Sequence, residues 1–230
     1  MRLDCFVADR FGVSRQKARD MILQQEILVN EKVQKPSYMI KKEDFVKLIE
    51  AKRFVSRAGD KLWLFLNKWN LSQKKVLDVG SSTGGFAQVL LDLGAEEVHC
   101  VDVGRDQLHQ SLRENPRIRV FEQCDIREFN APCFYDLLTC DLSFISIEKI
   151  FDALKRYSNE MILLFKPQFE VGRGIKRNKK GVVLDQLAIL KALDQFEEFL
   201  CFEKFTILKK EKSCIKGRMG NVEYFFHIRS

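Results

Sequence analysis

The segment KVLDVGSSTGGF, Lys75 to Phe86, places a glycine-rich turn directly after a short apolar run that ends in an acid. This order is typical of a buried parallel strand that delivers its carboxyl end to a small ligand. Gly80, Gly84 and Gly85 would let the backbone turn tightly and come close to that ligand. The glycine spacing departs from the dinucleotide pattern, so the segment predicts another kind of ligand site or a plain strand–turn–helix junction.

Composition sets the outer bounds on fold and partners. With 230 residues and 46% hydrophobic content, the chain can bury a full core in one domain or two. A net charge of +7 favours a polyanionic partner such as nucleic acid. Seven scattered cysteines and the lack of a signal-peptide core or a spanning apolar run indicate a cytoplasmic, soluble protein without a membrane partner. Three isolated histidines suggest no metal, and we expect a monomer or weak oligomer.

The first fifty residues have a pattern of their own. Apolar residues at helical spacing from Leu3 to Phe11 are followed by Gly12, and Ser14 then caps a second helix with a basic face. Two strands are expected around residues 27–30 and 45–49. The pattern predicts a compact ααββ unit over residues 1–50.

This unit resembles the S4 RNA-binding domain. The resemblance rests on Arg2-Leu3-Asp4, on Ser14-Arg15-Gln16-Lys17-Ala18 and on Val29-Asn30. It implies a small α+β domain that binds RNA phosphates, for which a solvated basic helix face is the alternative. The implied contact residues are Arg2, Arg15, Lys17 and Arg19.

After a linker expected over residues 51–55, strand and helix patterns alternate through residues 56–230. Strands are expected at Lys75–Val79, Glu97–Val103, Arg117–Glu122, Tyr135–Cys140, Met161–Phe165, Phe205–Lys210 and Val222–Ile228, with helices at Gly85–Leu93, Gln107–Glu114, Ser146–Tyr157 and Leu184–Phe199. Such alternation predicts an α/β fold with a mostly parallel sheet covered on both faces. The last two strands lack a clear helix between them, so an antiparallel edge is expected at the C-terminus.

Three acids, Asp78, Asp102 and Asp125, each follow an apolar strand. The second stands where an acid typically accepts hydrogen bonds from a ribose diol, although a strand-end cap is the alternative for any one of them. With the glycine turn, they resemble the S-adenosylmethionine site of class I methyltransferases, which implies that cofactor and a Rossmann-like seven-stranded sheet. The implied cofactor-binding residues are Asp78, Gly80, Ser82, Thr83, Gly84, Gly85, Asp102 and Asp125.

Lys166 follows the apolar run Met161–Phe165, so it either reaches out to solvent or is held in a site. In a site, a lysine can make a hydroxyl nucleophilic by taking its proton. Together with Lys61, Asp141 and Glu223 it resembles the Lys-Asp-Lys-Glu tetrad of RNA ribose 2′-O-methyltransferases. That resemblance implies that Lys166 activates the hydroxyl and Asp141 holds it, while the other two tune charge and position the ribose; buried ion pairs that support strand ends are the alternative.

The rest of the chain resembles the TlyA-type, or haemolysin A, family of ribosomal RNA methyltransferases with an FtsJ-like catalytic domain. The matching stretches are VSRAGDKL, DVGSSTGGF, VDVGRDQL, DLSFIS, KPQFE, KKGVV and GNVEYFF, with departures at Ala58 and Ser81. The resemblance implies methyl transfer to the ribose 2′-hydroxyl of a cytidine in ribosomal RNA, within a ribosomal subunit. The short form of the chain is similar to the subgroup that acts on large-subunit RNA, which favours 23S over 16S RNA.

The loop from Glu170 to Val183 combines three glycines with several cations. Further RNA contacts are expected at Arg57, Arg173, Lys176, Arg177, Lys179 and Lys180, with a solvated charge run as the alternative. A second basic cluster, from Lys209 to Arg218, is expected to extend the same surface. Two other functions stay open: an RNA-binding assembly protein with a vestigial methyltransferase fold, and a membrane-active haemolysin, which only the family's second name suggests.

Overall fold

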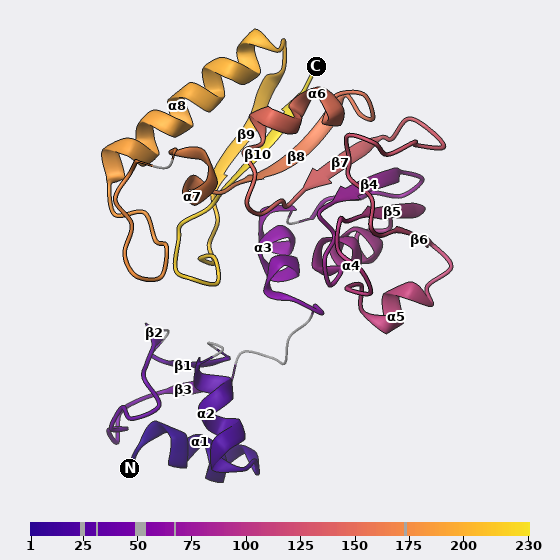
Figure 1. The fold of residues 1–230 in the computed structure, drawn as a ribbon. Helices are drawn as coiled ribbons and strands as arrows, with labels where there is room; N and C mark the ends of the chain where they lie inside the picture. Colours follow the sequence, from indigo (N-terminus) through magenta and orange to yellow (C-terminus); the bar gives the residue numbers. More distant parts are fainter. Residues whose placement is uncertain (24–25, 31, 49–53, 67, 173) are drawn as a thin grey trace. The chain divides into compact units, whose positions relative to one another are not determined.

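The computed structural model describes residues 1–23, 26–30, 32–48, 54–66, 68–172 and 174–230. They form two compact units, Met1–Arg53 and Phe54–Ser230 (Figure 1). Residues 51–53 of the expected linker lie outside the described residues, whereas Phe54 and Val55 belong to the second unit. No helix in the described part of the chain is long and apolar enough to cross a membrane.

The first unit packs two helices on a small antiparallel sheet. Its elements are α1 (Leu3–Phe11), α2 (Arg15–Leu23), β1 (Ile27–Val29), β2 (Lys32–Val33) and β3 (Val46–Leu48), with the strands in the order β2-β1-β3. Leu3, Val7 and Ile22 lie at the centre of its core. β2 adds a third strand to the two expected. It consists of two exposed residues, which give no apolar alternation for a sequence pattern to detect.

The second unit is built on a seven-stranded sheet. Its strands are β4 (Lys75–Val79), β5 (Glu97–Val101), β6 (Ile118–Phe121), β7 (Leu137–Cys140), β8 (Glu160–Phe165), β9 (Thr206–Lys212) and β10 (Tyr224–Arg229). Their order is β6-β5-β4-β7-β8-β10-β9, and β10 runs antiparallel to both of its neighbours, β8 and β9. The expected mostly parallel sheet is confirmed, and its antiparallel strand lies one position inside the edge strand β9.

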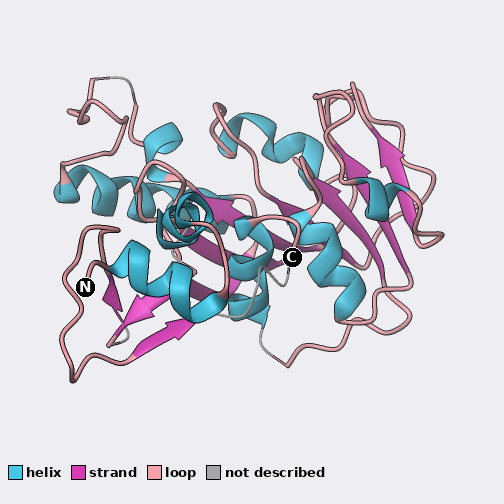
Figure 2. Ribbon diagram, turned by 90° about the horizontal axis from the view of Figure 1, so that it is seen from below, coloured by secondary structure: helices cyan, strands magenta, loops and turns pink. Residues whose placement is uncertain are grey.

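Helices cover both faces of this sheet (Figure 2). They are α3 (Arg57–Leu66), α4 (Gly85–Asp92), α5 (Gln110–Arg113), the 3₁₀ turn η1 (Glu148–Ile150), α6 (Phe151–Leu154), α7 (Pro167–Glu170) and α8 (Gln186–Phe202). Adjacent strand residues point to opposite faces, so Ile162 packs in the core that contains α3 and α4, whereas Leu163 packs in the core that contains α6 and α8. This two-sided burial explains the continuous apolar runs of the central strands.

The parallel strands all end at one edge of the sheet, and β10 begins there. Tyr224 at the start of β10 pairs with Phe165 at the end of β8. Glu223 and Lys166, the next residue beyond each partner, therefore reach the same edge as the turns that follow β4, β5 and β7. Topology alone thus gathers at one edge the segments in which the sequence predicts functional residues.

Candidate active site

Four side chains from separate segments form two ion pairs at this edge. Lys61 Nζ lies 2.6 Å from Glu223 Oε2, and Lys166 Nζ lies 2.6 Å from Asp141 Oδ1. Lys61 comes from α3, whereas the other three residues flank the ends of β7, β8 and β10. The structure therefore brings the four residues of the expected tetrad together as two pairs.

The pair of Lys61 and Glu223 is almost fully enclosed, with side chains 8% and 4% exposed. Lys61 donates a hydrogen bond to Glu223 Oε2, and Gly217 lies against the other oxygen, where a Cβ would collide with it. Because neither charge is solvated, removal of one partner would leave an uncompensated buried charge. The pair thus forms a fixed wall of the site.

The pair of Lys166 and Asp141 is more accessible. Lys166 precedes α7, where Pro167 occupies the first turn, and its Nζ also donates a hydrogen bond to Ser143 Oγ at 3.1 Å. Asp141 Oδ1 is buried, and its contact with Lys166 is an ion pair without hydrogen-bond geometry; among the described residues it has no other partner. The Lys166 ammonium is therefore held between the Asp141 carboxylate and the Ser143 hydroxyl.

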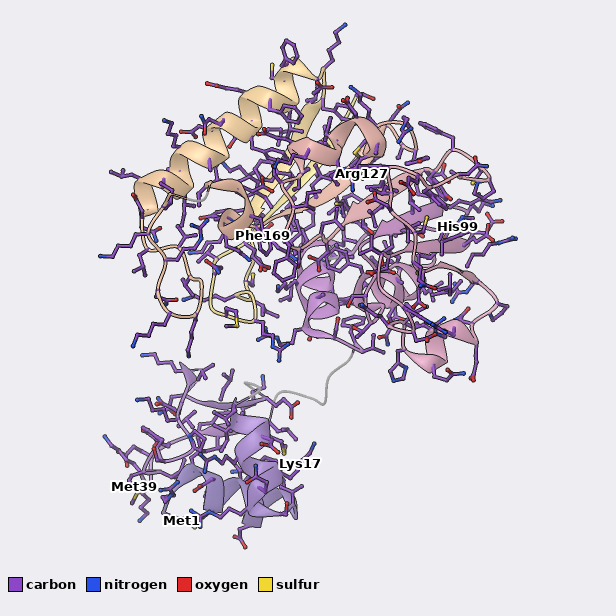
Figure 3. The ribbon with its side chains drawn as sticks, in the orientation of Figure 1. Met1, Lys17, Met39, His99, Arg127 and Phe169 are labelled. Carbon is purple, nitrogen blue, oxygen red and sulfur yellow. The ribbon has the colours of Figure 1, made fainter. Side chains whose placement is uncertain are left out.

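A cavity of about 910 Å³ lies over both ion pairs. Besides the four tetrad residues, its lining includes Arg57, Thr83, Gly85, Phe169, Arg177, Lys180, Arg218 and Asn221. Phe169, labelled in Figure 3, belongs to α7. A volume near the upper end of the range for small-molecule sites, with a basic rim, suits part of a larger anionic substrate.

A second cavity, of about 460 Å³, adjoins the first and shares Gly80, Ser82, Asp141, Ser143 and Phe144 with it. Its other lining residues include Val101, Asp102, Val103, Gln107, Asp125, Ile126, Arg127, Leu142 and Ile150. Carboxylates beside aliphatic side chains suit a nucleoside, which combines hydroxyl and amino donors with an apolar ring.

Asp102 ties the glycine turn to the loop after β5. Its two carboxylate oxygens accept hydrogen bonds from the backbone N–H groups of Ser82, at 2.8 Å, and Gly104, at 2.7 Å. Gly80 has a left-handed backbone (φ 78°), and a Cβ there would lie 2.8 Å from the carbonyl oxygen of Asp141. The close approach of the two chains therefore requires glycine at this position.

Asp125 faces the smaller cavity together with Arg127 (labelled in Figure 3). The Arg127 guanidinium donates hydrogen bonds to both oxygens of Asp125, at 2.9 and 2.5 Å, and lowers the pKa of this carboxyl to about 2. Asp125 is therefore ionised at neutral pH and can accept further hydrogen bonds through its remaining lone pairs.

Asp78 differs from the other expected cofactor residues. It is fully buried beneath the glycine turn and lines neither cavity, and its Oδ1 accepts a hydrogen bond from Thr139 Oγ1 at 2.8 Å. Burial raises the pKa of Asp78 to about 7, against the lowering effect of Thr139. Gly84 also lines neither cavity, so the structure does not bring either residue to the surface of the site.

The expected RNA contacts of the second unit divide into two groups. Arg57, Arg177 and Lys180 line the larger cavity, whereas Lys176 and Lys179 are exposed outside it and Arg173 lies outside the described residues. The Arg177 guanidinium donates hydrogen bonds to the carbonyl groups of residues 168, 172 and 175. This arginine therefore fixes the fold of its own loop.

In the first unit, Arg2 and Arg15 both contact the buried carboxylate of Asp4. Hydrogen bonds from Arg2 above all hold the pKa of Asp4 well below its usual range. The two guanidinium groups are thereby held in a fixed orientation, while Lys17 (labelled in Figure 3) and Arg19 are exposed on α2.

Sequence reasoning missed Glu122, which organises one wall of the smaller cavity. Its carboxylate accepts hydrogen bonds from Arg113 and from the backbone N–H groups of Asp106, Gln107 and Leu108, and these bonds lower its pKa to about 2, with Arg113 the main cause. α5 begins at Gln110 and not at Gln107 as expected, because Asp106 has a left-handed backbone (φ 52°) and His109 has a non-helical ψ of 140° and caps the helix through its side chain. An acid directly after a strand was the signal that could have found it.

Phe144 was also missed. Its side chain is 91% exposed, its backbone is left-handed (φ 69°), and its ring centroid lies 5.2 Å from that of Phe169. Exposed, strained aromatic residues are typical of functional sites, and this one borders both cavities. Sequence alone could not single it out, because an apolar residue beside DLS is equally consistent with a core position.

Comparison with known proteins agrees with this geometry. Residues 54–230 match the FtsJ-like methyltransferase family, and residues 1–46 match the S4 domain. The chain is 42% identical to the 23S rRNA (cytidine-2'-O)-methyltransferase TlyA of Campylobacter jejuni, over 99% of this chain and 98% of that one. It is 36% identical to Hemolysin A of Brachyspira hyodysenteriae, over 99% of both chains.

Solved structures point the same way. A protein described as a hemolysin from Streptococcus thermophilus aligns with a TM-score of 0.75 and 30% identity, over 100% of this chain and 88% of that one. A hemolysin from Lactococcus lactis aligns with a TM-score of 0.73 and 34% identity, over 78% and 89%. The chain belongs to the TlyA, or hemolysin A, family, in which an S4 domain precedes an FtsJ-like class I methyltransferase domain.

Proposed function

We propose that this chain transfers a methyl group from S-adenosylmethionine to the ribose 2′-hydroxyl of a cytidine in ribosomal RNA. The observation that carries the proposal is the position of the two ion pairs, which border a large basic cavity beside a nucleoside-sized one. The names of the TlyA relatives supply the acceptor. Residues 1–50 would bind RNA and residues 56–230 would carry the chemistry.

The smaller cavity fits S-adenosylmethionine, which supplies an electrophilic methyl group when bound. Asp102 would accept hydrogen bonds from ribose hydroxyls, and ionised Asp125 would accept them from the adenine amino group, since both line this cavity. Ile126 and Ile150 supply apolar surface for the ring. Asp141 lines both cavities, so the side chain that holds Lys166 also borders the cofactor cavity.

Lys166 acts as the general base. Nζ must first give up a proton to water, since only the neutral amine can accept one. As the 2′-oxygen bonds to the methyl carbon, the bond from that carbon to the sulfonium sulfur would break and leave a thioether, and the proton of the O–H group would pass to Nζ, which later releases it to water. Asp141 and Ser143 hold Nζ in place from two sides. Lys61 and Glu223 are more deeply enclosed, with side chains 8% and 4% exposed against 11% and 16% for Lys166 and Asp141, so this pair positions the ribose and does not take up the proton.

Several features favour an active enzyme that acts on 23S RNA. A vestigial fold would have no need for both ion pairs, the cofactor cavity and the glycine turn together, which argues against a pure assembly protein. The relative that matches at 42% over almost its whole length is named for 23S RNA, whereas the Mycobacterium tuberculosis relative named for both RNAs matches at 37% over 69% of its length.

The test is methyl transfer to large subunits, small subunits, naked 23S RNA and naked 16S RNA, all from cells that lack the modification. The expected result is one primer-extension stop, sensitive to 2′-O-methylation, in 23S RNA. A stop in 16S RNA would correct the choice of substrate. No transfer to any acceptor, despite measurable cofactor binding, would favour the assembly protein, and cofactor-independent leakage of vesicles would favour the haemolysin.

A further inference from the structure

Two loops form one side of the larger cavity. They are residues 171–183, which follow α7, and residues 213–223, which join β9 to β10 (Figure 1, orange and yellow). The first contributes Arg177, Lys180 and Gly181 to the lining, and the second contributes Gly217, Arg218, Met219, Asn221 and Glu223.

The exposed charges of the two loops are all positive. The only acidic residue in 171–183 and 213–223 is Glu223, which is paired with Lys61. Lys176, Lys179 and Lys180 of the first loop and Lys216 and Arg218 of the second are all exposed. Repulsion among these cations opposes the contact between the loops and favours a polyanion on their outer surface.

Asn221 joins the loops despite this repulsion. Its side chain is buried, its Oδ1 accepts a hydrogen bond from the Val183 N–H at 3.0 Å, and its Nδ2 donates one to the Gly181 carbonyl at 3.2 Å. One amide thus pairs with the N–H and C=O groups of residues two apart, as a neighbouring strand would. Both hydrogen bonds cross from one loop to the other, so a single side chain links the two backbones directly.

Asn221 is also connected, through Gly217, to Glu223 of the ion pair with Lys61. The Asn221 carbonyl accepts a hydrogen bond from the Gly217 N–H at 2.8 Å, and Gly217 packs against the carboxylate of Glu223. A shift of Asn221 would therefore move both the cationic loops and the contact that surrounds Glu223.

We propose that the two loops act as a single RNA-phosphate-binding wall beside the target ribose, and that Asn221 is the positioning residue that holds this wall together. The proposal rests on the proposed function for the identity of the polyanion. It assigns Asn221 no contact with the reacting atoms.

The test exploits the absence of charge on Asn221. Asn221→Ala changes no charge, so a change in the salt dependence of RNA binding must come from displaced cations. For each phosphate that the protein no longer neutralises, the slope of log affinity against log salt becomes shallower by about 0.7 to 0.9. We expect binding of transcribed 23S RNA, measured between about 50 and 300 mM salt, to show a slope shallower by about 1.5 and an affinity about tenfold lower at the low-salt end.

Two controls make the result specific. Asn115→Ala also removes an amide oxygen that accepts a backbone N–H, but Asn115 lines neither cavity, and its slope should equal that of the natural chain. Lys180→Ala should weaken binding in the natural chain and have a smaller effect once Asn221 is replaced. The affinity for S-adenosylmethionine should stay unchanged in Asn221→Ala, because no described residue of either loop lines the smaller cavity.

An unchanged slope in Asn221→Ala, with a shallower slope in Lys180→Ala, would overturn the proposal. If Asn221→Ala does not fold, hydrogen exchange of the Val183 amide in the natural chain tests the proposal instead. Protection of this amide would support its hydrogen bond to Asn221, and exchange at the rate of an open loop would refute it. RNA binding is measured without turnover, so the two proposals can fail separately. If the salt-dependence slope changes in Asn221→Ala but the natural chain methylates no RNA, the proposed function is contradicted and this inference is not.

Discussion

Asp78 should make the second unit less stable as the pH rises. Its pKa is about 7 in the folded chain, because burial disfavours the charged form, against an ordinary value of 3.8. Below pH 3.8 both folded and unfolded states are protonated, and the group has no effect. Between pH 3.8 and 7 only the unfolded state ionises, so the free energy of unfolding falls by about 1.4 kcal/mol per pH unit, and by about 4 kcal/mol in all.

Asp78→Asn cannot ionise and should escape this loss. Any packing cost of the amide is the same at every pH, so the difference in unfolding free energy between variant and natural chain is the informative quantity. From the two pKa values, this difference should move in the variant's favour by about 2 to 3 kcal/mol between pH 5 and 8. Thr139→Val removes a bond that lowers this pKa and should extend the fall to higher pH.

Urea unfolding followed by tryptophan fluorescence suits this experiment. Trp63 and Trp69, the two tryptophans of the chain, both belong to the second unit, so the signal does not mix the two units. A difference between Asp78→Asn and the natural chain that stays constant from pH 5 to 8 would refute the reasoning.

Two further predictions concern the walls of the site. Glu122→Gln loses its charged bond to Arg113 and part of its hold on the loop that carries Gln107, so titration calorimetry should show S-adenosylmethionine binding about tenfold weaker; unchanged affinity would mean that the loop keeps its shape without the carboxylate. Lys61→Met and Glu223→Gln should each lower the free energy of unfolding by about 3 to 5 kcal/mol, and the double variant by less than the sum; additive losses in urea unfolding would show that the two charges are not coupled.

The sequence predicts this fold well where burial on two faces leaves a strong pattern. The acids and glycines at the ends of β4 and β5 can be located, because strand ends are marked by the change from apolar to polar residues. Short elements cannot be detected in this way, because a helix such as α7, with four residues, is too short to show helical periodicity. The charge of Arg177 predicts an RNA contact, which stays a prediction, but its bonds to three carbonyl groups depend on a loop path that charge does not encode.

Contacts between residues that are far apart in the sequence could not be predicted either. Lys61 and Glu223 are separated by 162 positions, and no local pattern specifies their contact. The family resemblance proposed the four tetrad residues as a set, but the division into one enclosed pair and one accessible pair comes from the strand order. The two hydrogen bonds from Asn221 to the other loop likewise follow only from the folded chain.

The role of Lys166 as the base is the central claim, and single-turnover methyl transfer to unmodified large subunits tests it most directly. Lys166→Ala removes the proton acceptor, but Lys166 is not among the residues that line the smaller cavity. We predict that transfer falls by at least about a hundredfold while S-adenosylmethionine affinity stays within about twofold of the natural chain. Transfer by Lys166→Ala at close to the natural rate would contradict the account.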